Sequence, residues 1–138
     1  MSTVLFVTRT DWDEPPRLRH QLAELLVARG HRVEFCERPT HLPWQAQVPP
    51  RMPDGVSRVR LRRYYEPLHH QLKALSVLTA ISNAVVMRSV RRIARQSKPD
   101  VVFNFNHDYA FVDQAVPHAR FVTVLNDDFV ALARPWMR

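Results

Sequence analysis

Glycine is scarce in this chain, since Gly30 and Gly55 are the only two among 138 residues. Loops of the GxGxxG and GxxxxGK[ST] types need several glycines, because their backbone must approach phosphate groups closely. The sequence therefore excludes a nucleotide site built from glycine-rich turns. Glu37 is the last residue of the predicted second strand, where an acid can bind a ribose, but without those glycines it gives little support for a nucleotide site.

Cysteine is scarcer still, because Cys36 is the single one in the chain. It lies in an apolar run, forms no intramolecular disulfide, and is expected to be a buried thiol in a reducing compartment. Residues 1–9 lack the order of segments that defines a signal peptide, so we expect a cytoplasmic protein. The seven histidines do not follow metal-ligand spacing, and no metal site is predicted.

Short apolar runs rich in β-branched residues alternate with helical patterns, which is typical of an α/β domain. The length suits one domain, which we take as residues 1–138. Strands are predicted at residues 3–7, 32–37, 56–65, 101–105 and 120–125. We therefore expect a Rossmann-like three-layer α/β/α domain, with a parallel sheet of about five strands in the order 3-2-1-4-5.

Two longer helices are predicted between these strands. The first runs from about Arg17 to Arg29, after two prolines and before Gly30, and its core face is expected to be four leucines: Leu18, Leu22, Leu25 and Leu26. The second covers residues 68–97, with an uncharged middle at 74–87. Fourteen residues are too few to span a bilayer, which leaves a buried core helix or a segment in a membrane interface.

Acidic residues are almost missing from residues 55–99, which hold ten Lys or Arg against Glu66 alone. Such a basic block predicts an anionic partner: a membrane surface, a phosphorylated ligand or nucleic acid. Nucleic acid is disfavoured, because the interleaved aromatics of common RNA-binding motifs are missing. Arginines on a helix also simply complement its carboxyl end. The predicted anion- or membrane-binding residues are Arg58, Arg60, Arg62, Arg63, Arg88, Arg91, Arg92 and Arg95.

Polar residues follow the first, fourth and fifth predicted strands. Because parallel strands end at the same edge of a sheet, these residues are expected to form one site. His107 with Asp108 or Asp127 suits a general base or a hydroxyl-binding pair, although polar residues at strand ends also serve as helix caps and turns. Besides His107 and Asp108, the predicted substrate-binding residues are Asp11, Trp12, Asp13, Glu14, Arg17, Asn104, Asn106, Tyr109, Asn126, Asp127 and Asp128.

Two stretches resemble the N-terminal domain of a glycosyltransferase with the two-domain GT-B architecture, and the likeness is closest to family 4. They are residues 11–35, with the RGH-x-V turn at 29–33, and residues 98–111, with the PDVV and HDY motifs. A later strand ends in NDD at residues 126–128. The resemblance implies a transferase that moves a sugar from a nucleotide-sugar donor to a carbohydrate or glycolipid acceptor.

The resemblance also implies which substrate each domain binds. The first domain receives the acceptor, with His107 and Asp108 near the transferred sugar, and a second domain or a partner subunit holds the nucleotide sugar. The loop after the first strand lacks the family's glycines, which favours acceptor over donor binding there: Trp12 can stack on a sugar, and Asp11 and Asp13 can accept its hydroxyl hydrogens. The chain ends before any second domain, so we expect it to bind no cofactor and to be inactive alone.

A second hypothesis belongs to another class of protein. The chain could be a non-catalytic α/β module that binds a partner chain, an anionic membrane or nucleic acid through its basic block. A short α/β domain also leaves a sheet edge exposed, which favours self-association. Under the glycosyltransferase hypothesis, the same basic block places a cytoplasmic enzyme at the periphery of a membrane.

Overall fold

The computed structural model describes residues 1–8, 10–37, 51–61 and 76–124. These residues form a five-stranded sheet in the order β3-β2-β1-β4-β5, in which every neighbouring pair is parallel. The strands are β1 (Thr3–Val7), β2 (Arg32–Glu37), β3 (Val56–Arg60), β4 (Val101–Asn104) and β5 (Arg120–Thr123). The predicted Rossmann-like class and strand order are confirmed, and the strand order reverses between the neighbours β1 and β4, which makes this the switch point of the sheet.

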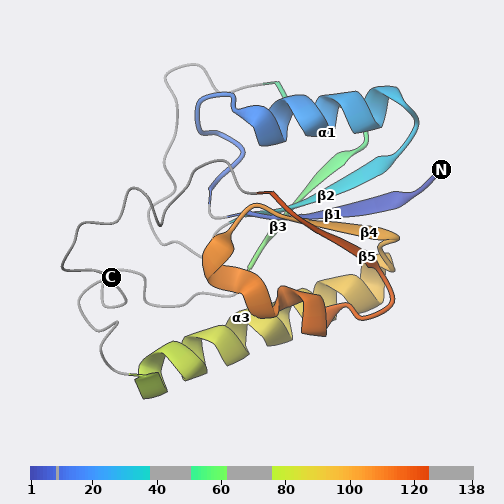
Figure 1. The fold of residues 1–138 in the computed structure, drawn as a ribbon. Coiled ribbons are helices and arrows are strands. Elements are labelled where there is room, and N and C mark those ends of the chain that lie inside the picture. The colour runs from blue at the N-terminus through green and yellow to red at the C-terminus, as the bar shows by residue number, and fades with distance from the viewer. Residues whose placement is uncertain (9, 38–50, 62–75, 125–138) are drawn as a thin grey trace.

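Helices cover both faces of the sheet, as Figure 1 shows. Helix α1 (Leu18–Ala28) lies on one face, while α3 (Ser76–Ser97) and the 3-10 helix η1 (His107–Ala115) lie on the other. The helix predicted at residues 68–97 is confirmed from residue 76 onward, and residues 68–75 lie outside the described part. Likewise β3 confirms the first half of the strand predicted at 56–65.

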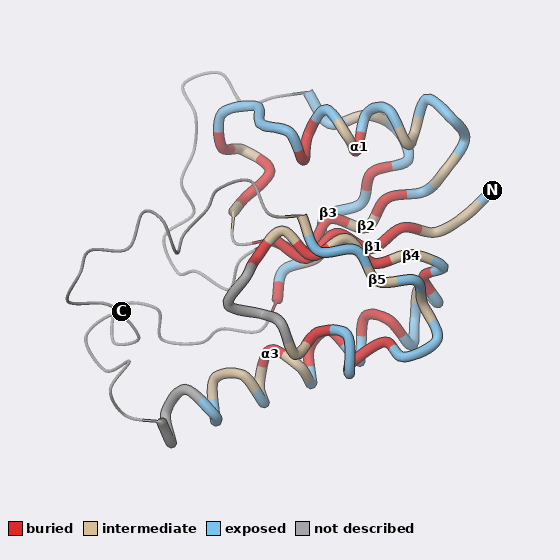
Figure 2. The backbone as a smooth tube through the Cα atoms, viewed as in Figure 1, coloured by how far each residue is buried: buried red, intermediate tan, exposed pale blue. Residues whose placement is uncertain are grey.

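The alternation of side chains along β1 divides the core into two clusters. Val4 and Phe6 pack toward the α1 face, whereas Leu5 and Val7 pack toward α3 and η1. A strand covered on both faces needs an uninterrupted apolar run, which is what the sequence shows there. The buried segments of Figure 2 accordingly lie along the central strands. Cys36 is a buried free thiol in this core, as predicted, and burial raises its pKa above the ordinary value.

The predicted core face of the first helix is wrong at two of its four leucines. Leu18 is 50% exposed and Leu25 is 46% exposed. The buried residues of α1 are Arg19, His20 and Ala23, with Leu22 and Leu26 partly buried beside them. The helix is therefore rotated relative to the prediction, and its position brings His20 against the loop that follows β1.

Both long helices end in backbone that turns left-handed. Gly30 has φ +82°, and the amides of Gly30 and His31 donate back to the carbonyls of Val27 and Leu26, which is the Schellman arrangement. At the end of α3, Lys98 has φ +48° and its amide donates to Ala94, just before Pro99. The predicted stop at Gly30 is thus confirmed, and α3 ends at Ser97, which is the predicted end of the second helix.

Within the described residues, no helix combines the length and the apolar character that crossing a membrane requires.

Candidate functional site

The candidate site is the carboxyl edge of the sheet, where β1, β2 and β4 end side by side. Val7 is paired with Cys36 on one side and with Asn104 on the other. Thr8, the first residue beyond β1, is fully buried, and its hydroxyl lies 3.0 Å from the carbonyl oxygen of Cys36. The loops after β1 and β4 therefore start from adjacent strands, where open α/β sheets bind ligands.

The exit of β4 is fixed by two buried asparagines. The side-chain oxygen of Asn104 accepts a hydrogen bond from the amide of Asn106 at 3.0 Å, which makes an Asx turn. The carbonyl of Asn104 accepts the amide of Val124 at 2.9 Å, so the segment after β5 is held beside it. This turn redirects the chain into η1, whose first residue is His107.

Several predicted site residues lie beyond this description. The side chains of His107, Asp108 and Tyr109 are outside the described part of the structure, although η1 places their backbone directly after the turn. Asn126, Asp127 and Asp128, and the basic residues Arg62 and Arg63, lie outside the described residues altogether. Their roles stay predictions.

The loop after β1 is held by an ionic network to β2 and β3. Both carboxylate oxygens of Asp13 accept hydrogen bonds from the guanidinium of Arg58, at 3.1 and 2.8 Å. Glu37 is buried and accepts from Arg58 Nε at 2.7 Å and from Arg60 at 3.3 Å. It also accepts the backbone amide of Trp12 at 2.9 Å. One buried carboxylate thus ties the loop to two strands.

This network corrects the roles predicted for Arg58 and Arg60. Both were assigned to an anion-binding surface, but their guanidinium groups form ion pairs with acids of the same chain. Burial lowers the pKa of Arg58, but hydrogen bonds to Asp13 and the charge of Glu37 raise it more, so the net shift is upward. Arg58 therefore serves as a brace for the loop.

The prediction that Trp12 stacks on a sugar is also wrong for this conformation. Its side chain is 1% exposed and belongs to the core cluster on the α1 face. The ring meets Phe35 at a centroid distance of 5.0 Å and His20 at 4.7 Å, both edge to face. Trp12 therefore anchors the loop, and its indole offers no open face to a ligand.

The remaining acids of the loop are also held by arginines. Asp11 is fully buried and lies 3.9 Å from Arg60, and its amide donates to Glu14 at 3.2 Å. Glu14 in turn lies 3.5 Å from the buried Arg19, whose pKa burial lowers to about 10. At neutral pH Arg19 is still charged, so the pair is ionic. Arg17, another predicted site residue, is exposed at the start of α1.

His20 is a residue that the sequence analysis did not identify. Its Nδ1 accepts the amide of Arg17 at 3.0 Å, so its Nε2 donates to the carbonyl of Trp12 at 2.9 Å. This is a capping box in which histidine replaces the usual Glu or Gln three residues into the helix. The sequence feature that could have identified it is a histidine at the third position of a helix that begins just after Pro15 and Pro16. Burial lowers the pKa of His20, and protonation would remove the acceptor that Arg17 needs.

This arrangement predicts a pH dependence of stability that depends on His20. As the pH falls through 6.5, the ordinary pKa of histidine, His20 binds a proton in the unfolded chain. In the folded chain its lowered pKa keeps it neutral. The free energy of unfolding should therefore decrease between pH 7.5 and 5.5, and less steeply in His20→Gln, which keeps an acceptor but does not titrate. Urea titrations at several pH values measure both slopes. Equal slopes would contradict the role of His20.

In the part of the chain that the structure describes, no three His, Cys, Asp or Glu side chains are grouped so that they could hold a metal ion. The described side chains at this edge include carboxylates, amides, hydroxyls and the guanidinium groups that pair with the carboxylates. Such a set suits hydrogen bonding to a polyol and acid–base catalysis.

Comparison with known proteins gives a likeness of fold. No protein-family model matches the sequence, and a comparison with curated proteins gives no match. Among solved structures, the chain is similar to the crystal structure of CalG4, the calicheamicin glycosyltransferase, with a TM-score of 0.56 and 14% identity. The match covers 88% of this chain and 32% of that one, so this chain spans about a third of its length. The chain therefore has a Rossmann-like α/β fold that is shared by part of a glycosyltransferase.

Proposed function

We propose that this chain is the N-terminal, acceptor-side half of a GT-B glycosyltransferase. The enzyme transfers a sugar from a nucleotide-sugar donor to a carbohydrate or glycolipid acceptor. The observation that supports this most is the carboxyl edge of the sheet: the loop from β1 and the Asx turn from β4 leave adjacent strands, at the edge where open α/β sheets bind ligands. The fold shared with part of a glycosyltransferase agrees with it.

The two loops have different tasks in this proposal. The loop after β1 is preorganised by Arg58 and Glu37, and Asp13 is its part-exposed carboxylate, with 21% of the side chain accessible. Asp13 would accept a hydroxyl hydrogen of the acceptor. After the turn at Asn106, His107 would take the proton of the attacking hydroxyl as the donor loses its nucleotide, and Asp108 would orient the imidazole.

The donor nucleotide is assigned to residues outside this chain. The chain has two glycines and so lacks a glycine-rich phosphate loop, and it spans 32% of the glycosyltransferase it resembles in fold. A C-terminal domain or a partner subunit would hold the nucleotide sugar, and the 138-residue chain alone would not transfer sugar. The exposed Arg88, Arg91 and Arg92 of α3 would rest against an anionic membrane on its cytoplasmic side.

The experiment measures transfer by the intact enzyme, that is, this chain together with the C-terminal domain or partner subunit that would hold the donor, and it uses two histidines of this chain. Release of nucleoside diphosphate is followed with a panel of nucleotide sugars and sugar acceptors. His107→Ala should lower the turnover number about a hundredfold, because a general base contributes at least that much. His31→Ala is the matched control: His31 lies at the amino edge, where its Nδ1 accepts the amide of Ser2, and its loss should leave turnover unchanged.

Two results would overturn the proposal. One is the absence of nucleoside diphosphate release with every donor in the panel. The other is equal turnover in His107→Ala and the wild type, which would remove the assigned base. Thermal unfolding of each variant separates a loss of catalysis from a loss of structure.

A further inference from the structure

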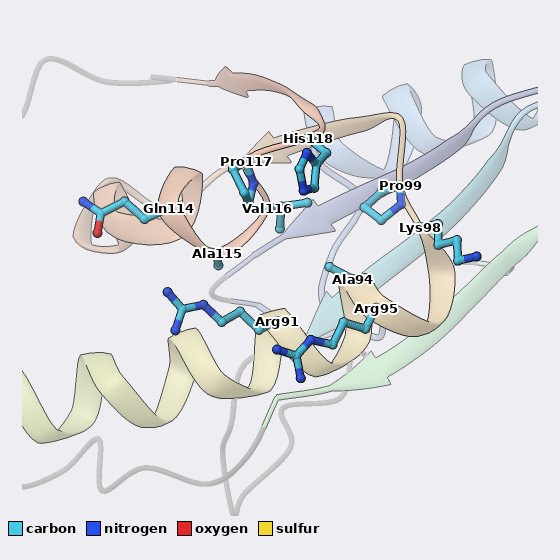
Figure 3. Close-up of a pocket in the computed structure, with 10 residues that line it drawn as sticks. All are labelled: Arg91, Ala94, Arg95, Lys98, Pro99, Gln114, Ala115, Val116, Pro117 and His118. Atoms are coloured by element: carbon cyan, nitrogen blue, oxygen red, sulfur yellow. The ribbon is translucent and has the colours of Figure 1, made fainter.

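A hollow lies at the amino edge of the sheet, away from the loops after β1 and β4. It is an open cavity of about 730 Å³ between the last turns of α3 and the segment that joins η1 to β5. Pro99, just before β4, and His118, just before β5, are both in its wall, which fixes its place at that edge. Figure 3 shows this cavity.

The charged residues of the cavity are all basic. Arg91 and Arg95 project from the same side of α3, and His118 points from the η1–β5 segment toward the helix (Figure 3). Lys98 also lines the cavity, but its side chain points away from Arg91 and Arg95 (Figure 3). None of the ten residues in the wall is acidic, and no hydrogen bond or ion pair joins Arg91, Arg95 or Lys98 side chains to other described residues. Arg58 and Arg60, in contrast, form ion pairs with acids of the same chain.

The helix dipole explains the position of only some of these basic residues. Cations are favourable near the carboxyl end of a helix, but the effect fades within the last turn. Arg95 is in the last turn of α3, whereas Arg91 lies a further turn back. Arg91 also borders a neighbouring hollow with Arg88 and Arg92, which adds to the positive potential there. The cluster is therefore more basic than the end of the helix requires.

The floor of the cavity is apolar. Ala94, Ala115 and Val116 are nearly buried and belong to the core cluster on this face of the sheet, and Pro117 continues the wall beside them. Guanidinium groups beside an apolar floor match a ligand that has a phosphate at one end and an apolar group at the other. We propose that this cavity binds a phosphate ester with an apolar substituent. This inference does not rest on the proposed glycosyl transfer.

The test uses hexyl phosphate as the probe and the full-length protein, with binding measured by isothermal titration calorimetry. Hexyl phosphate should bind at least about tenfold more tightly than inorganic phosphate, because its chain covers the apolar floor. The double variant Arg91→Gln/Arg95→Gln should lose at least about tenfold in affinity for hexyl phosphate. The matched control Arg29→Gln/Arg51→Gln removes two exposed arginines elsewhere and should keep wild-type affinity.

A single isosteric variant guards against misfolding of the double variant. Gln114→Glu changes one exposed residue of the cavity wall into an acid of nearly the same shape, and it too should weaken binding of hexyl phosphate. The proposal is overturned if hexyl phosphate does not bind. It is also overturned if Arg91→Gln/Arg95→Gln and Gln114→Glu both bind it as tightly as the wild type.

A second arm identifies the source of the ligand. Sedimentation with phosphatidic acid vesicles is compared with sedimentation with phosphatidylcholine vesicles. If hexyl phosphate releases the protein from phosphatidic acid and Arg91→Gln/Arg95→Gln no longer sediments, the site takes a lipid headgroup. If hexyl phosphate binds but vesicle binding is missing or unchanged by the variant, the site takes a free phosphate ester. Both outcomes support the cavity as the binding site.

Discussion

Replacing Glu37 with alanine is expected to lower the free energy of unfolding by about 3 kcal/mol, because it removes a buried charged acceptor from two arginines and an amide. The carboxylate is 3% exposed and accepts from Arg58, from Arg60 and from the backbone of Trp12. For a domain of this size, the midpoint of thermal unfolding should fall by ~10 °C.

The expected loss has two parts with different origins. The amide of Trp12 lies in the core and would be left without its acceptor, which costs roughly 1–3 kcal/mol. The lost ion pairs cost less than a fully buried pair would, because the Arg58 and Arg60 side chains are 31% and 42% exposed and water screens them. Arg58 also keeps Asp13 as a partner.

Two further variants test this division. Glu37→Gln keeps an oxygen for the amide of Trp12 but loses the charge, so its destabilisation should fall between the wild type and Glu37→Ala. Glu24→Ala removes an exposed acid of α1 and should change the free energy of unfolding by less than about 0.5 kcal/mol. Urea unfolding followed by circular dichroism measures all three. If Glu37→Ala unfolds at the same urea concentration as Glu24→Ala, the network does not hold the loop.

The sheet was predictable because its signals are local and strong. The central strands β1 and β4 are short apolar runs, and residues that end helices precede the strands: Gly30 adopts the left-handed backbone of a helix end before β2, and Pro99 cannot continue the helix before β4. The order of strands then follows from right-handed connections between parallel neighbours. These rules depend only on the length and the handedness of each connection. A wrong prediction for one side chain therefore does not change the predicted strand order.

The face of α1 was not predictable from its own residues. Apolar side chains cover more than one side of this helix, so the leucine pattern admits more than one rotation. The rotation is decided by contacts from elsewhere: His20 must meet the backbone of Trp12, and Ala23 must fit in the core cluster of Phe6 and Phe35. These contacts join residues from different segments. The periodicity of a single segment therefore cannot predict them.

The anion-binding roles predicted for Arg58 and Arg60 were wrong for a related reason. Arg58 and Arg60 alternate with Val59 and Leu61, which pack on the core, but the prediction summed charge along the chain and did not consider acids on other segments. The acids that neutralise them, Asp13 and Glu37, come from other segments and reach them only because β2 pairs with β3. Among the described residues, no ion pair joins the basic residues of α3 to an acid, so their anion-binding role stays a prediction.

Trp12 is the side chain whose truncation is expected to destabilise the protein most. Trp12→Ala should lower the free energy of unfolding by about 4 kcal/mol, because it empties a buried site between Phe35 and His20. Trp12→Phe keeps an aromatic ring and should lose about half as much. Leu18→Ala truncates an apolar residue that is 50% exposed and should cost less than about 0.5 kcal/mol.

The same variants distinguish the core role of Trp12 from the sugar-stacking role first expected for it. A stacking residue would raise the KM for the acceptor while leaving the unfolding midpoint unchanged. A core residue does the reverse in Trp12→Phe: the unfolding midpoint falls, and the KM of the fraction that is folded stays within about twofold. Chemical unfolding and acceptor kinetics on the same preparations decide between them. A raised KM at an unchanged midpoint would show that the ring leaves the core to meet the acceptor.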